Sequence, residues 1–114
     1  MDQLKIAMEL WKSGERNFHE NMFIAATVDY SKAVFAAIDY AIIKKLGIKP
    51  DSHEKRFNIV FYRFRGIYPF LKLVYDRYRD AYSRVISKEE ALEVRKNAEK
   101  IFKELGILEE ITKE

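Results

Sequence analysis

Residues 17–53 have the sequence NFHENMFIAATVDYSKAVFAAIDYAIIKKLGIKPDSH, and this stretch decides the fold class. Apolar side chains occupy almost the whole circumference of a helix that begins at Asn17 and ends at Gly47. Its polar strip is narrow and consists of Asn21, Asp29, Lys32 and Asp39. A helix that is apolar nearly all round is stable only when other helices surround it. We therefore expect an all-α protein organised around one long central helix.

The sequence around this central helix predicts further helices with short connections. We expect the first over residues 2–12, ended by Ser13-Gly14, and we expect an Asn17-x-x-Glu20 capping box to start the long helix. Gly47 and Pro50 mark the break after it, and Asp51-x-x-Glu54 is expected to open a helix that runs to about Phe64. Short connections of this kind favour an antiparallel, up-and-down bundle of about five helices.

The second half of the chain supplies the last two helices of the predicted bundle. Pro69 suits the first position of a helix, whose expected apolar face is Leu71, Val74, Tyr75, Tyr78, Ala81, Tyr82 and Val85. Ser87-x-x-Glu90 is a capping box for the next helix, which Gly106 is expected to end. We expect residues 1–106 to form one domain and residues 107–114 to form a short, frayed acidic tail.

Composition excludes several classes of function. The 114 residues include no cysteine, which excludes disulfides and thiolate metal sites. Charged residues lie inside the long helix, where hydrocarbon would make them costly, and charges precede any apolar run near Met1. The sequence shows no glycine-rich phosphate loop, no His-x3-His pair and no Ser/His/Asp grouping. We expect a cytoplasmic protein that does not enter a membrane and has no metal or other cofactor.

Three patterns occur in order along the chain: SKAVFAA at 31–37, GIKPDSH at 47–53 and RYRDAY at 77–82. Together they resemble HEPN domains (higher eukaryote and prokaryote nucleotide-binding), most closely the small, stand-alone prokaryotic branch. In that branch the long helix often carries Ser-Arg-Ala-Tyr-Tyr-Ala, the break has Gly-x-x-x-x-Ser/Thr-His, and a later helix has an Arg-x-x-Ala-Asp-Tyr-like run. The resemblance covers about residues 1–105, with Val34-Phe35 and Asp39 as departures from it.

The resemblance implies a nucleotide- or RNA-associated module. Such domains often form homodimers, and prokaryotic members often pair with a minimal nucleotidyltransferase in a toxin–antitoxin or nucleotide-handling system. Catalytic HEPN ribonucleases resemble one another in an Arg-x4–6-His motif. In this chain Arg16 precedes His19 by only three residues, and no arginine lies at the required distance before His53. We therefore favour a non-catalytic module, with a divergent ribonuclease or a purely structural interaction module as the alternatives.

Basic charge is concentrated in residues 53–84, which carry eight positive and three negative groups, a net charge of +5. The candidate residues for phosphate or nucleotide binding are His53, Lys55, Arg56, Arg63, Arg77, Arg79 and Asp80, with Asp80 orienting an arginine. Interleaved aromatic residues would suit single-stranded nucleic acid. The alternative is structural: the tyrosines form core, the first turn of the helix is capped and solvated, and Asp76–Arg79 and Asp80–Arg84 are surface ion pairs.

The polar strip of the long helix is a third candidate site. Asp29 and Asp39 are ten residues apart, about 15 Å along a helix, which is too far for them to share a metal ion. We expect the strip to lie at the solvent edge, or to form a polar patch inside a dimer interface.

Overall fold

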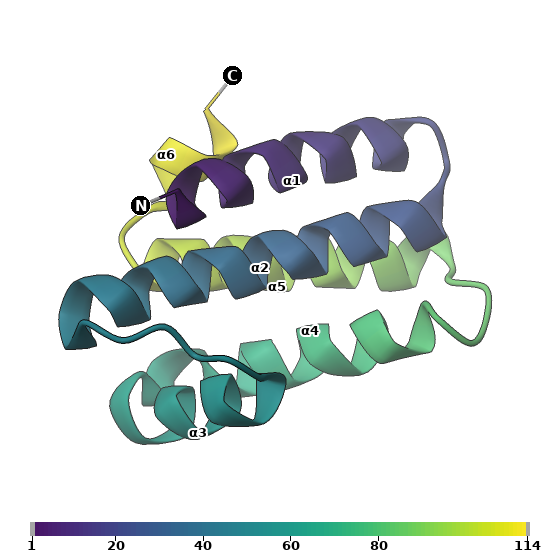
Figure 1. The fold of residues 1–114 in the computed structure, drawn as a ribbon. Coiled ribbons are helices and arrows are strands. Elements are labelled where there is room, and N and C mark those ends of the chain that lie inside the picture. The colour runs from purple at the N-terminus through teal and green to yellow at the C-terminus, as the bar shows by residue number, and fades with distance from the viewer. Residues whose placement is uncertain (1, 114) are drawn as a thin grey trace.

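The computed structural model describes residues 2–113, and every regular element in that range is a helix. Within that range there are six α-helices and one short 3-10 helix: α1 (Gln3–His19), α2 (Phe23–Leu46), α3 (His53–Arg63), η1 (Arg65–Ile67), α4 (Tyr68–Asp80), α5 (Lys88–Glu104) and α6 (Leu108–Thr112). Helices α1 and α2 are antiparallel, and α4 and α5 pack on the side of α2 that faces away from α1. Helix α3 lies beside the N-terminal end of α4 (Figure 1). The prediction of an all-α bundle is confirmed.

Helix α2 is the centre of the core, as its sequence predicts. Tyr30, Val34, Ile38 and Ile42 are fully buried on it, and Ala33 and Ala37 are buried where neighbouring helices approach. None of the helices within residues 2–113 combines the length and the apolar character needed to cross a lipid bilayer.

The first helix is longer than predicted, because Gly14 lies inside α1 and does not end it. A Cβ atom at Gly14 would lie 2.6 Å from Cδ1 of Tyr30, so the glycine serves close packing between α1 and α2. The turn falls instead at Asn21, whose φ of 62° is the left-handed conformation that asparagine tolerates. Helix α2 therefore begins at Phe23, and the predicted cap at Asn17 is wrong.

The central break and the cap of α5 match the local sequence signals. Gly47 ends α2 with a φ of 73°, and Ser87 and Glu90 form the predicted reciprocal capping box. The cap of α3 is one residue later than predicted, since the Ser52 hydroxyl, and not Asp51, accepts from the Lys55 backbone N–H.

Two predictions for the second half of the chain are wrong. Helix α4 ends at Asp80, so Tyr82 and Val85 leave its apolar face and are exposed. The segment after Gly106 is not frayed: Leu108–Thr112 forms α6, and Ile107 and Ile111 are buried in the core beside α1. Both ends of the described chain consequently lie at the same end of the bundle (Figure 1).

Candidate functional site

A buried ion pair joins α2 to the first turn of α3. Arg56 donates from Nε to Oδ1 of Asp39 over 2.8 Å and from Nη2 to Oδ2 over 2.9 Å. The two side chains are only 10% and 7% exposed. Burying two charges is favourable only when the geometry is good and the remaining polar atoms are satisfied. The expectation that Asp39 lies at the solvent edge is therefore wrong, because this carboxylate holds the candidate residue Arg56 in place.

His53 extends this cluster toward α4. Arg56 Nη1 lies 2.8 Å from Nδ1 of His53. Because an arginine can only donate, Nδ1 must accept, and the neutral ring carries its proton on Nε2. The ring packs 4.8 Å from Phe35 and 5.0 Å from Tyr75, measured between centroids. Burial and the adjacent Arg56 charge lower the pKa of His53, with Asp39 opposing them. The fold thus favours an uncharged His53.

A shallow cavity of about 640 Å³ opens over the cluster. Its lining comes from three parts of the chain: Gln3 and Ile6 of α1, Ala36 and Asp39 of α2, and the segment from Lys49 to His53 together with Arg56. Of the five N–H groups of Arg56, three donate to Asp39 and His53. Each of its three nitrogens therefore has a partner, and no acceptor among the described residues is found for the second N–H of Nη1 or of Nη2. Because Arg56 is one of the residues that line the cavity, these two N–H groups are the donors that Arg56 has left for a ligand or for water.

The candidates Arg77 and Asp80 belong to a different cluster, which faces α5. Asp80 accepts from Arg77 over 3.2 Å and from Arg84 over 2.9 Å, which confirms the predicted Asp80–Arg84 pair. Arg84 also donates to Glu90, and Arg77 Nε lies 3.3 Å from a carboxylate oxygen of Glu93. The predicted role of Asp80, to orient an arginine that contacts phosphate, stays a prediction. The network that Asp80 joins connects α4 to α5 and is separate from the cavity at α3.

The remaining candidates Lys55, Arg63 and Arg79 are exposed on α3 and α4. Among the described residues, no carboxylate lies within 4.0 Å of these three side chains, so the predicted Asp76–Arg79 pair does not form. The Arg79 guanidinium lies over the ring of Tyr75, 5.9 Å from its centroid. These cations remain accessible to a negatively charged ligand.

Two further polar clusters lie between helices and were missed from the sequence. Asp29 accepts from the Asn17 amide over 2.9 Å and from the Ser13 hydroxyl, so it joins α1 to α2 and does not lie at a free solvent edge. Of the three charged residues in the polar strip of the long helix, only Lys32 is exposed. Glu15 accepts from Tyr30 and from Arg95, each over 2.6 Å.

The Glu15 cluster shifts the acidity of two groups in opposite directions. Burial alone would raise the pKa of Glu15, but the hydrogen bonds from Arg95 and Tyr30 outweigh burial and lower it. Burial and the Glu15 carboxylate raise the pKa of Tyr30. No sequence signal pairs these residues, because Glu15 and Arg95 are 80 positions apart. Their role is to join α1, α2 and α5.

Within the part of the chain that the structure describes, no three His, Cys, Asp or Glu side chains are grouped so that they could hold a metal ion. Comparison of the chain with protein-family models, curated protein sequences and solved structures finds no match. The likeness to HEPN domains is thus a hypothesis from the sequence, and function has to be argued from the geometry of the site.

Proposed function

We propose that the protein is a non-catalytic, HEPN-like module that binds a phosphate-bearing ligand, a nucleotide or RNA, in the cavity at the start of α3. The observation that carries this proposal is the state of Arg56. Asp39 and His53 orient its guanidinium through three hydrogen bonds and it lines the cavity, yet two of its N–H groups have no acceptor among the described residues. A phosphate group supplies several strong acceptor oxygens at once, and arginine recognises it through paired N–H donors.

The surroundings of Arg56 favour an anionic ligand in two further respects. Lys49 lines the cavity and is exposed. The first turn of α3 begins beside it, and unpaired backbone N–H groups at a helix N-terminus attract negative charge. The two acidic residues of the lining have different effects on an anionic ligand. The Asp39 charge is paired with Arg56, whereas Asp51 is exposed and weakens the positive potential at the cavity.

The resemblance to HEPN domains supports two further parts of the proposal. A homodimer and a minimal nucleotidyltransferase partner are both common among the domains that this chain resembles. Neither depends on the cavity, so each is tested separately: sedimentation tests the homodimer, and co-purification with the product of a neighbouring gene tests the partner.

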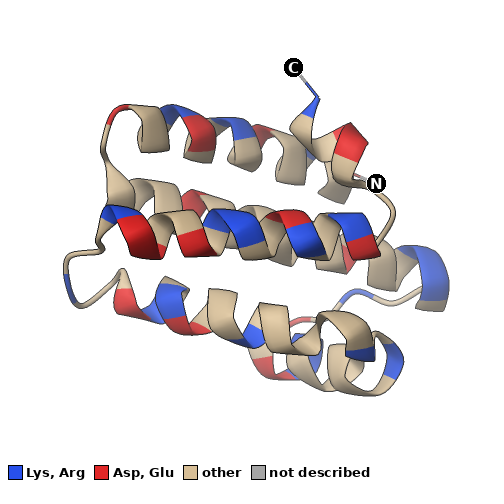
Figure 2. Ribbon diagram, turned by 180° about the vertical axis from the view of Figure 1, so that it is seen from behind, with Lys and Arg blue, Asp and Glu red and all other residues tan. Residues whose placement is uncertain are grey.

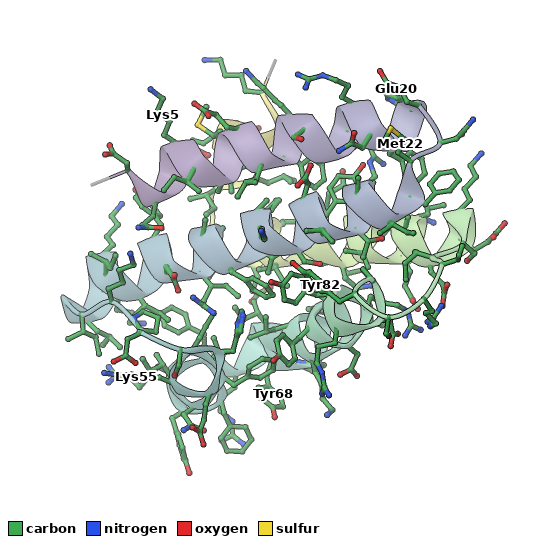
Figure 3. All side chains as sticks on the ribbon, turned by 45° about the vertical axis from the view of Figure 1, so that its right-hand side comes forward. Lys5, Glu20, Met22, Lys55, Tyr68 and Tyr82 are labelled. Atoms are coloured by element: carbon green, nitrogen blue, oxygen red, sulfur yellow. The ribbon has the colours of Figure 1, made fainter. Side chains whose placement is uncertain are left out.

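Calorimetric titration with AMP, ATP and inorganic phosphate at low salt tests binding in the cavity. We expect ATP to bind, and Lys49→Gln to weaken binding by about 2- to 5-fold, as for one partly exposed charge contact. Lys5→Gln is the matched control, because Lys5 is an exposed lysine on α1 outside the cavity lining (Figure 3). Absence of heat with all three ligands, or equal weakening by the two variants, would refute the proposal.

A further inference from the structure

Aromatic rings form a continuous strip along α3 and α4. We define the aromatic strip as Phe61, Tyr68, Phe57, Tyr75, Tyr78 and Tyr82, in order of contact. Successive ring centroids in this order are 5.2, 6.1, 5.1, 6.1 and 5.2 Å apart. Tyr62 extends the strip beyond Phe61, at 5.0 Å. Figure 3 shows Tyr68 and Tyr82 on the same side of the bundle as Lys55. The strip therefore follows the whole length of α4.

The ends of the aromatic strip are open to solvent. Tyr62 is 73% exposed, Tyr82 is 65% exposed and Phe61 is 41% exposed, whereas the middle of the strip is half-buried. The half-buried rings pack on α2 and on each other and so contribute to the core. Core packing does not account for the exposed rings, which lie at the two ends of the strip and are joined by the half-buried rings between them. Exposed aromatic surface of this kind is a candidate binding site.

Cations line the aromatic strip. The Arg65 guanidinium lies 5.5 Å from the centroid of Phe61, and the Arg79 guanidinium lies 5.9 Å from that of Tyr75. Among the described residues, neither arginine has a carboxylate within 4.0 Å. By contrast, Figure 2 shows acidic and basic residues alternating along α5 on another face of the bundle. The strip thus combines aromatic rings with two arginines that form no ion pair within residues 2–113, although Asp76 and Asp80 line a surface pocket together with Arg79.

His53 connects the strip to the cavity at α3. His53 lines that cavity, and its ring lies 5.0 Å from Tyr75 and 5.8 Å from Tyr78. His53 therefore lies between the cavity, which no residue of α4 lines, and the rings of α4, so a strand with a phosphate at Arg56 would pass over His53 to reach those rings. Alternating anionic groups and flat aromatic groups are the chemistry of a nucleic acid strand with unpaired bases.

We infer that the aromatic strip binds single-stranded nucleic acid, with bases stacked on its exposed rings and phosphates held by Arg65, Arg79 and the cavity. This inference rests on the proposed function and names its ligand. Base stacking requires unpaired bases, which excludes a duplex. A second copy of the chain is a poorer occupant, because a two-fold contact would bring together two copies of a segment, residues 53–84, whose net charge is +5.

Fluorescence anisotropy with a labelled strand of about 12 nucleotides tests the inference, since sites on single strands commonly span about 4–16 nucleotides. RNA and DNA of one sequence, and the corresponding duplexes, are titrated in parallel at two salt concentrations. We expect both single strands to bind more tightly than either duplex, with affinity falling as salt rises. The ratio of the affinity for RNA to the affinity for DNA then shows which of the two the strip prefers.

Variants at the exposed ends assign binding to the strip without disturbing the core. We expect Tyr62→Ala and Tyr82→Ala each to weaken binding of the strand by about 5- to 150-fold, the range for one lost stacking contact. Tyr62→Phe and Tyr82→Phe should retain most of the affinity, because the ring remains. Arg79→Gln should weaken binding and reduce its dependence on salt, whereas the control Arg16→Gln changes an exposed arginine on α1 and should have no effect.

The outcomes separate this inference from the proposed function. In one outcome ATP binds and Lys49→Gln weakens its binding, but the strand binds no more tightly than ATP and its affinity is unchanged by Tyr62→Ala and Tyr82→Ala. The aromatic strip is then not a nucleic acid site, and the inference is overturned. Loss of strand binding in the tyrosine variants with ATP binding unchanged supports it. Self-association that the tyrosine variants abolish, without any binding of strands, would show that the strip is a protein interface and would also overturn the inference.

Discussion

Removal of either member of the Arg56–Asp39 ion pair is expected to destabilise the protein strongly. Asp39→Ala leaves a guanidinium that is only 10% exposed without its carboxylate, and Arg56→Ala leaves the carboxylate without its two donors, at 2.8 and 2.9 Å. Breaking a buried pair by removing one partner costs about 3–5 kcal/mol. Each single variant should therefore lose a large part of the total stability.

The size of the expected effect follows from the length of the chain. An unfolding entropy of about 2.1 cal/mol/K per residue gives about 240 cal/mol/K for 114 residues, so a loss of about 3–5 kcal/mol lowers Tm by about 12–20 °C. The double variant Asp39→Leu/Arg56→Met removes both charges and fills the space with apolar atoms. It should recover most of the loss, because neither charge is left buried alone.

Urea unfolding and thermal melts at pH 7 of the wild type, both single variants and the double variant measure the coupling between the two residues. We expect the double variant to be much more stable than the sum of the single changes predicts. The reasoning is refuted if each single variant lowers Tm by less than about 4 °C, which would mean that solvent screens the pair, or if the two losses add.

Three further predictions concern single side chains. Because folding lowers the pKa of His53, the unfolded state takes up a proton there more readily than the folded state does. The free energy of unfolding should therefore fall as pH drops below about 6.5 and through the folded pKa. Urea titrations from pH 8 to pH 5 should show a smaller fall of this free energy in His53→Gln than in the wild type. Gly14→Ala should lower Tm despite a gain of about 1 kcal/mol in helix propensity, because its Cβ would lie 2.6 and 2.8 Å from ring atoms of Tyr30. Gly66→Ala meets only the side chain of Glu104, whose Oε2 is the nearest atom at 3.3 Å, and should change Tm little; equal melts of the two variants would contradict this. Ile111→Ala should cost about 2–5 kcal/mol in urea unfolding, because Ile111 is fully buried; the exposed control Glu110→Ala should stay within about 0.5 kcal/mol, and a neutral Ile111→Ala would show that α6 is not part of the folded core.

The candidate site could be predicted only in part. Clustered charge and the break at Gly47 drew attention to His53 and Arg56, and both line the cavity. Charge counting also selected Arg77 and Asp80, but these residues belong to the ion-pair network that joins α4 to α5. A sequence shows that a residue is charged, but the net charge available to a ligand depends on which carboxylates fold against it.

The sequence by itself determined the helical class, the burial of α2, the break at Gly47 and the capping box at Ser87. These features depend on interactions within a few residues, namely apolar periodicity, the left-handed conformation of glycine and reciprocal capping bonds. Only the tertiary structure decided that Gly14 continues α1, that Asp39 is the partner of Arg56, and that the rings of α3 and α4 form one strip beside the cavity. Each of those outcomes depends on how the helices pack. Packing brings together side chains that are distant in the sequence, and at Gly14 it turns a local signal for a helix end into a close contact between helices.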